Sequence, residues 1–163
     1  MNDDTITIRR ATLDDRAIVL HFHRALYIDH RDTIVDPVAL PLFAYRDMDA
    51  TLRDDVLGLL RSRESTVLLA ERSGVPVGYI SGHTEVDARR VLPRRGVIED
   101  WYVDPELRGQ GVGTRLMERM EGLFRARGCD VMESGTWAFN RGARDAHARA
   151  GFSEIEVKFR KRL

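Results

Sequence analysis

The clearest cluster of residues with a chemical use is the segment R-G-Q-G-V-G, residues 108–113, between a strand-like run and a helix-like run. Backbone N–H groups at the start of a helix have no acceptor within it and carry partial positive charge. Glycines allow positive φ and let a bulky anion approach the main chain. The segment predicts a phosphate or diphosphate site, with Arg108 as an added charge. A plain glycine-rich connector is the alternative for this spacing alone.

Two well-known phosphate loops do not fit this segment. A Walker loop places a lysine and then Ser or Thr after its last glycine, whereas Thr114 follows Gly113 directly. A dinucleotide-binding fingerprint has the spacing G-x-G-x-x-G after the first strand of a parallel unit. Here the spacing is G-x-G-x-G and the preceding strand is the fourth that we expect.

A second motif, N-R-G-A-R-D-A-H-A-R-A-G-F at residues 140–152, follows at a suitable distance. With the Y-V-D-P that precedes the glycine segment, the two motifs resemble the GCN5-related N-acetyltransferases (GNAT). That family has an acetyl-CoA loop of the form R/Q-x-x-G-x-G/A and a later N-x-x-A-x-x-L-Y-x-x-x-G-F. The order of the expected elements also matches, so the resemblance covers nearly the whole chain.

The resemblance implies acetyl-CoA as the cofactor and a sheet that is splayed apart between its fourth and fifth strands. In that family pantetheine lies in the gap and pairs with the fourth strand. The cofactor-binding residues carried over to this chain are Trp101, Tyr102, Val103, Arg108, Gly109, Gln110, Gly111, Val112, Gly113, Thr114, Asn140, Arg141 and Ala143.

Two carboxylates, Glu99 and Asp100 in V-I-E-D-W-Y-V, are the candidates for a catalytic base. Strand alternation aims only one of them at the cleft, although a β-bulge can re-aim the other. The alternative is an ion pair with one of the many arginines. As functional groups they would act as a base through water or as an anchor for a cationic substrate. The segment I-E-D at residues 98–100 also resembles the corresponding segment in the polyamine and diamine acetyltransferase branch of the family.

For the catalytic acid, His147 stands where the family commonly has a tyrosine. It lies seven residues after Asn140 and four after Ala143, which places all three on one face of a helix. An imidazolium could donate a proton to the leaving thiolate. Two alternatives remain. His147 could be a packed or exposed histidine without a catalytic role, or the thiolate could leave toward water without an acid. The resemblance assigns the oxyanion to a main-chain N–H, of Tyr102 or Val103.

We expect no metal site. The single cysteine, Cys129, has no nearby residue to lower its pKa, and we expect it to pack in the core. The H-x-H at His21 and His23 points its two rings to different faces of a helix. His30 and His83 have no ligand spacing.

The hydrophobic pattern predicts an α/β (α+β) fold in which a mixed, mostly antiparallel sheet carries helices on both faces. The expected strands are 6–11, 65–72, 75–86, 96–103, 129–137 and 153–163, with a hairpin at Ser73-Gly74. The expected helices run from Thr12 to near Asp29, around 52–60, from 112 to 128 and from about 140 to 150. Residues 30–46 read as a loop or broken helix.

Composition sets the broad class. The 163 residues suit one domain, 1–163, and 26 basic against 26 acidic residues argue against nucleic acid as a partner. No run of residues is apolar enough for a membrane span, and the start M-N-D-D-T-I is unlike a signal peptide. We therefore expect a cytoplasmic protein that does not bind membranes.

These observations predict an acetyl-CoA-dependent N-acetyltransferase that acts on a primary amine of a small, cationic molecule in a ternary complex. A protein N-terminal or lysine acetyltransferase and a non-catalytic acyl-CoA-binding module are the alternatives. Candidates for the acceptor wall are Tyr27, Asp36, Phe43 and Tyr45. A homodimer is possible, since the strand expected at 153–163 offers an edge.

Overall fold

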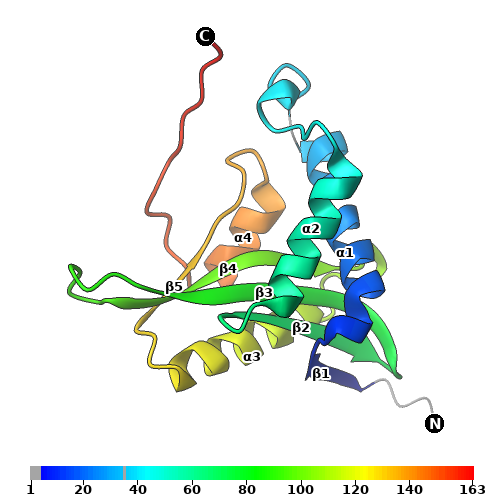
Figure 1. The fold of residues 1–163 in the computed structure, drawn as a ribbon, viewed down its shortest axis with the longest axis vertical. Helices are drawn as coiled ribbons and strands as arrows, with labels where there is room; N and C mark the ends of the chain where they lie inside the picture. The colour runs from blue at the N-terminus through cyan, green and yellow to red at the C-terminus, as the bar shows by residue number, and fades with distance from the viewer. Residues whose placement is uncertain (1–4, 35) are drawn as a thin grey trace.

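The structure is a computed structural model that describes residues 5–34 and 36–163, and in these residues five strands form one mixed sheet (Figure 1). The strands are β1 (Ile6–Arg10), β2 (Ser65–Arg72), β3 (Val75–Val86), β4 (Arg94–Val103) and β5 (Val131–Ser134). They lie in the order β1-β2-β3-β4-β5. Neighbours are antiparallel except β4 and β5, which are parallel. The predicted fold class is confirmed.

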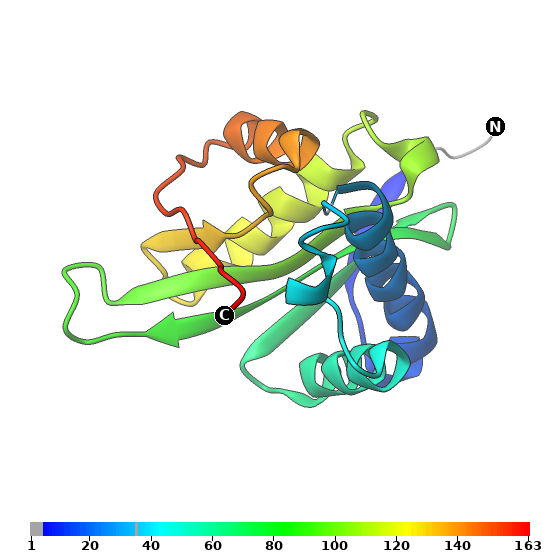
Figure 2. The same cartoon turned by 90° about the horizontal axis from the view of Figure 1, so that it is seen from above.

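Helices cover both faces of this sheet. The α-helices are α1 (Arg16–Asp29), α2 (Met48–Arg61), α3 (Val112–Ala126) and α4 (Arg141–Arg149). Helices α1 and α2 lie over one face and α3 lies against the other (Figures 1 and 2). The predicted broken segment begins with a π-helical turn, His30–Ile34, and continues to a short 3-10 turn, Leu40–Leu42.

Strand β2 shows why the sheet is buried on both sides. Residues 66–70 are all buried. Val67 and Leu69 pack with Val19, Phe22 and Val56 of the helices α1 and α2. Leu68 and Ala70 pack in the second cluster, which holds the apolar face of α3. Alternation along a strand therefore divides one apolar run between two cores.

Two local features shape the sheet: a tight hairpin between β2 and β3, and a close approach of α3 to β4. At the β2–β3 turn, Ser73 and Gly74 both have positive φ, 51° and 78°, as a two-residue hairpin of type I′ requires. Under α3, the ring of Phe124 lies over Gly96, where an added Cβ would come within 2.2 Å of it. Glycine at position 96 therefore lets α3 approach the sheet closely.

Strands β4 and β5 pair over only part of their length. Their parallel ladder runs from Arg95 opposite Val131 to Ile98 opposite Ser134. Beyond Ile98, β4 continues to Val103 without β5 as a neighbour, while it stays paired with β3. The expected splay between the fourth and fifth strands is confirmed, and it opens beside residues 99–103.

The prediction of a last strand at 153–163 is wrong, because the structure assigns no strand to these residues. They form an extended trace that leaves the sheet (red in Figure 1) and carries exposed Ile155, Val157 and Phe159. Arg160 donates to the Leu42 carbonyl at 2.6 Å. Alternation of apolar and polar residues marks two faces, but a strand also needs a neighbour for its backbone hydrogen bonds.

None of the helices in the described part of the chain is both long and apolar enough to cross a membrane.

Candidate active site

The glycine segment forms an open turn at the start of α3. Gly109 and Gly111 have left-handed φ values of 77° and 83°. Among the described residues, no hydrogen-bond acceptor is assigned to the amides of 109–114, and the first amide to find one is that of Arg115, which donates to the Gly111 carbonyl at 3.1 Å. An added Cβ at Gly109 or Gly111 would meet nothing within 4 Å, so this face of the turn is open. These features fit a diphosphate.

Trp101 joins this turn to the gap beside β4. A Cβ on Gly113 would lie 3.2 Å from Trp101 Nε1. That indole N–H is buried and, within the described chain, has no hydrogen-bond partner. A buried donor without an acceptor is costly, so its place beside the turn favours a ligand that accepts from it.

Arg108 is less free than its position in the motif suggests. Its Nε donates to the Val103 carbonyl at 3.0 Å, and its Nη2 donates to Asp29 at 3.2 Å. The guanidinium also lies 5.5 Å from the centre of the Tyr102 ring. Arg108 therefore connects the end of β4 to the end of α1, and its role as a charge beside a phosphate stays a prediction.

A β-bulge in β4 determines where the two predicted carboxylates point. Ser81 pairs with Asp100 and Gly82 pairs with Ile98, so Glu99 is the extra residue. Ser81 Oγ donates to Asp100 Oδ2 at 3.0 Å, and His83 Nδ1 lies 2.7 Å from Glu99 Oε1. Because Ser81 and His83 share one face of β3, both carboxylates lie on that face. This is the face covered by α1.

Asp100 is the more enclosed of the two, with 14% of its side chain exposed. His23 Nδ1 from α1 lies 3.3 Å from Asp100 Oδ2 and 3.0 Å from the Tyr79 hydroxyl. Burial lowers the pKa of His23, but the carboxylates of Asp100 and Asp55 raise it by more. Burial, aided by the charge of Asp100, raises the pKa of Tyr79 well above its ordinary value, so Tyr79 is a neutral donor.

Glu99 lies in a more open group of charges, with 45% of its side chain exposed. Its partner His83 also contacts Glu85 through Nε2 at 3.0 Å. Arg95 binds Glu85 at 2.6 Å and Glu133 at 3.1 Å. Hydrogen bonds from His83 and Arg95 lower the pKa of Glu85. The ion-pair alternative thus applies to both carboxylates, but the partners are histidines rather than arginines.

His147 faces the gap from α4 with both nitrogens engaged. Its Nδ1 lies 2.6 Å from the Ala143 carbonyl, which can only accept, so Nδ1 carries a proton. Its Nε2 lies 2.7 Å from Ser134 Oγ at the end of β5. The ring packs edge-on against Trp101, with 5.5 Å between the ring centres. His147, Ser134 and Trp101 therefore meet where β4 and β5 separate.

The second motif begins with a helix cap. Asn140 Oδ1 accepts from the Ala143 amide at 3.0 Å, which satisfies a free donor at the start of α4. Its Nδ2 lies 3.4 Å from His30 Nε2, across from the end of α1. Burial lowers the pKa of His30, so the neutral ring can accept from Asn140.

The aromatic residues proposed for the acceptor wall fall into two groups. Tyr27 and Tyr45 stack with their ring centres 5.3 Å apart. Phe43 packs edge-on against Trp137 at 4.3 Å. Asp36 instead accepts from the Val38 amide in a local turn. Burial, followed by the charges of Asp55 and, more weakly, Asp100, raises the pKa of Tyr45, so this pair lies within the electrostatic range of Asp100.

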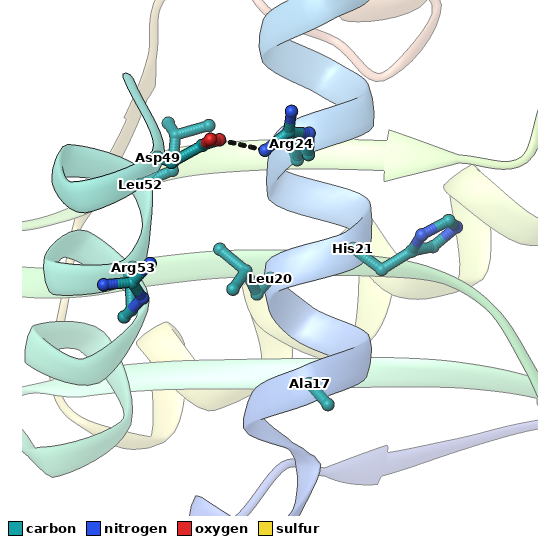
Figure 3. A pocket seen from close by; sticks show the side chains of 7 residues that line it. All are labelled: Ala17, Leu20, His21, Arg24, Asp49, Leu52 and Arg53. Carbon is teal, nitrogen blue, oxygen red and sulfur yellow. Dashed lines mark hydrogen bonds and ion pairs between the residues drawn. The ribbon is translucent and has the colours of Figure 1, made fainter. Parts of the chain in front are cut away.

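A separate hollow of about 370 Å³ lies between α1 and α2 (Figure 3). The residues that line it are Ala17, Leu20, His21, Arg24, Asp49, Leu52 and Arg53. An ion pair between Arg24 and Asp49 crosses it. None of the predicted site residues is in this lining, so the hollow is not part of the candidate site.

In the part of the chain that the structure describes, no three His, Cys, Asp or Glu residues are placed to hold a metal ion. His21 is exposed and points away from α2, whereas His23 contacts the sheet, so the two rings do lie on different faces (Figure 3). Cys129 packs against the core below α3, and burial raises the pKa of its thiol. Both observations agree with the expectation of a packed, unreactive cysteine.

Comparison with known families then decides the classification. Residues 28–152 match the model of the acetyltransferase (GNAT) family. This chain belongs to the GNAT family. The family and the class of enzyme, an acyltransferase that uses acetyl-CoA, agree with the sequence prediction.

Several GNAT proteins are similar to this chain. The aminoglycoside N(6')-acetyltransferase type 1 of Klebsiella aerogenes is 44% identical over 109 residues, which cover 63% of this chain and 70% of that protein. An uncharacterized N-acetyltransferase of Methanocaldococcus jannaschii is 30% identical over 103 residues, 61% of this chain but only 44% of that protein. The structure of the aminoglycoside N-acetyltransferase AAC(6')-Iy in complex with CoA shares the GNAT fold, with a TM-score of 0.76 at 20% identity over 98% of this chain and 96% of that one.

The sequence predicted candidate site residues along β4 and α3, but it gave no sign of several side chains that surround Asp100 and His147. His23, Tyr79 and Ser81 come together around Asp100 from two other elements. Ser134 beside His147 was also missed. No local spacing signals these contacts. A weak hint was the polar Ser81, which directly follows the apolar run at residues 77–80.

Proposed function

We propose that this enzyme transfers an acetyl group from acetyl-CoA to a primary amine of a small, cationic molecule such as an aminoglycoside or a diamine. The observation that carries the proposal is the bulge at Glu99, which turns two successive carboxylates toward α1 at the point where β4 and β5 separate. Two carboxylates on one wall suit an acceptor with more than one ammonium group. The amine attacks directly in a ternary complex.

Residues of the α3 side would hold the cofactor. The amides of 109–114 would receive its diphosphate, and Trp101 Nε1 offers a further donor beside Gly113. The main chain of 101–103 would pair with the pantetheine arm in the place that β5 leaves. Asn140, Arg141 and Ala143 would flank it from the first turn of α4. Acetyl-CoA, when bound, supplies the acyl group as an activated thioester.

Asp100 and Glu99 would hold and deprotonate the acceptor. An amine is a nucleophile only when neutral, so the site must both attract an ammonium and remove its proton. Asp100, enclosed by His23, Tyr79 and Ser81, would do this directly or through one water. Glu99, which is more exposed, would attract the charge of the substrate.

Two further groups would act on the other side of the reacting centre. A main-chain N–H of Tyr102 or Val103 would donate to the oxyanion, in the part of β4 that lacks β5 as a neighbour. His147 would hold the proton that the departing sulfur needs, and Ser134 is in hydrogen-bond contact with its Nε2.

Chemistry of the relatives supports a cationic acceptor. The Klebsiella aerogenes and Stenotrophomonas maltophilia relatives are both aminoglycoside N(6')-acetyltransferases, the latter 30% identical over 120 residues. The stacked Tyr27 and Tyr45 supply aromatic faces within the electrostatic range of Asp100, which favours cations through cation–π contact.

The test is release of free CoA from acetyl-CoA with a panel of aminoglycosides, diamines, amino acids and lysine-containing or N-terminal peptides. We expect turnover with an aminoglycoside or diamine and none with the peptides. Turnover with peptides alone would contradict the small-molecule proposal. Binding of acetyl-CoA without turnover on any acceptor would instead favour an acyl-CoA-binding module.

We propose also that the chain forms a homodimer through residues 153–163. Ile155, Val157 and Phe159 are exposed on this extended segment, and β5 is the edge strand of the sheet. An exposed alternating segment and a free edge are complementary. Light scattering of the full chain should give twice the monomer mass, and removal of residues 154–163 should give a monomer. A monomeric full chain would contradict the proposal.

A further inference from the structure

We propose that His23 is a positioning residue for the acceptor amine, which fixes the orientation and balances the charge of Asp100. This inference rests on the proposed function of Asp100 as the carboxylate that meets the amine. It concerns a residue outside both GNAT motifs, on the opposite side of β4 from the glycine turn.

Side chains of α1 and β3 surround Asp100. His23 Nδ1 and Ser81 Oγ both approach Oδ2, at 3.3 and 3.0 Å. The Tyr79 hydroxyl acts on the same carboxylate through a hydrogen bond. Side chains of α1 and β3 thus orient the carboxylate, and in this proposal its remaining hydrogen-bonding capacity meets the amine.

His23 is itself held in place. Tyr79, which is fully buried, lies 3.0 Å from His23 Nδ1 and fixes the plane of the ring. His23 Nε2 is buried and has no hydrogen-bond partner in the described chain, and Asp55 of α2 lies 3.6 Å away. An imidazolium would therefore face carboxylates at both nitrogens.

Charge balance explains why a histidine suits this place. A carboxylate with most of its surface buried is unfavourable unless a positive group compensates it. A fixed lysine or arginine would compete with the ammonium of the substrate for the carboxylate. His23 instead contacts one oxygen of Asp100, Oδ2, from α1 and is held there by Tyr79. The other titratable groups that act on this cluster are Tyr79 on β3, Asp55 on α2, His30 in the π-helical turn and Tyr45 after the 3-10 turn.

The test compares His23→Asn, which keeps a neutral donor near the place of Nδ1, with His23→Leu, which removes donor and charge. The matched control is His21→Leu on the exposed side of the same helix. We expect His23→Leu to lower kcat/KM for the acceptor about 100-fold, the size of a misplacement of about 1 Å. His23→Asn should recover part of this loss. In its pH profile of kcat/KM, the acidic limb should lie at higher pH than in the profile of the wild type. The dissociation constant for acetyl-CoA should not change in either variant.

Values of kcat/KM for His23→Leu within twofold of those for His21→Leu, with the same pH profile, would overturn the inference. Imidazole NMR gives a readout that does not depend on turnover. The His23 resonances should titrate at lower pH in Asp100→Asn than in the wild type, and an unchanged titration would also overturn it. Failure of the proposed function differs from both, because the wild type would then release no CoA with any amine.

Discussion

On the α3 side of β4, the candidate diphosphate site consists of main-chain amides in a turn of six residues, and two left-handed glycines shape it. On the α1 side, the proposed acceptor carboxylate Asp100 depends on His23 of α1 and Ser81 of β3, which lie 77 and 19 residues away along the chain. The first site is local and made of backbone. The second is assembled by the tertiary fold, and its parts are recognisable only when the elements have packed.

This difference predicts that mutations will act differently on the two sides. Substitutions in the turn should change cofactor affinity through backbone conformation. Substitutions around Asp100 should change acceptor kinetics and leave cofactor affinity unaltered. Variants on the two sides test that separation, and variants of the surrounding scaffold, with smaller expected effects, test what holds the two sides in place.

The largest effect is expected for Asp100→Asn. It removes the charge with almost no change in shape, so kcat/KM for a cationic acceptor should fall about a thousandfold. Glu99→Gln should cost only about tenfold, or about 1.4 kcal/mol, because Glu99 is exposed and acts at longer range. Steady-state kinetics with calorimetric binding of acetyl-CoA measures both. If the two variants had equal effects, or if Asp100→Asn weakened acetyl-CoA binding, the separation of the two sides would be contradicted.

Next in size is Gly111→Ala on the cofactor side. A residue with a Cβ in the left-handed region costs about 1–2 kcal/mol, so the turn should relax and misplace an amide. Loss of one hydrogen bond to a charged group, about 1.5–3 kcal/mol, would weaken acetyl-CoA binding about 10- to 100-fold.

The matched control for Gly111→Ala is Gly58→Ala near the C-terminal end of α2, where an added Cβ also meets nothing within 4 Å. It should stabilise the helix by about 0.5–1 kcal/mol and leave acetyl-CoA affinity unchanged. Equal affinities for the two variants in a calorimetric titration would show that the turn does not hold the diphosphate.

Gly96→Ala tests the packing below β4 without touching either ligand. The new Cβ would lie 2.2 Å from the Phe124 ring, so the ring must move. We expect a loss of about 1–3 kcal/mol in the free energy of unfolding. Urea denaturation of Gly96→Ala, Phe124→Leu and the double variant checks the cause. The double variant should lose less than the sum of the two, and simple additivity would argue against the clash.

The smallest effect concerns Asp15, at the entrance to α1. A bidentate contact with Arg9 lowers the pKa of Asp15 from 3.8 to about 2. The ionised form is thus favoured by folding, and its contribution is complete above about pH 4 and is lost as the pH falls through about 2. Because Arg9 is 42% exposed, we expect only about 1 kcal/mol for Asp15→Asn at pH 7.

Urea denaturation at pH 7 and at pH 2 measures this contribution. The difference between the wild type and Asp15→Asn should shrink to a small fraction of its pH 7 value at the lower pH, because Asp15 is then largely protonated in the unfolded chain and about half protonated in the folded protein. A difference that persists there would mean that the carboxylate acts through packing rather than through its charge.

Local signals explain what the sequence could predict. The Ser73-Gly74 hairpin, the turn at 108–111 and the apolar face of α3 each depend on neighbouring residues, and all three are present in the structure. The splay between β4 and β5 came from the family resemblance. Its physical cause is visible in the structure, where β5 ends at Ser134.

What the sequence could not predict depends on partners distant along the chain. The bulge at Glu99 follows from the pairing of β4 with β3, and only the register decides it. His23 appeared simply as a poor metal ligand, since its contacts with Tyr79 and Asp100 require the packed fold. The last segment alternates as a strand does, but no pattern within it supplies a neighbour.

The extra residue in β4 also has a consequence for mutagenesis. Before it, the even-numbered Gly96 and Ile98 face α3, and after it, the odd-numbered Trp101 and Val103 do. The strand thus changes parity at Glu99, so a library that varies every second position would cross from one core to the other part-way along. Deletion of this one residue would restore uniform alternation, with Asp100 as the single carboxylate left on the face toward α1.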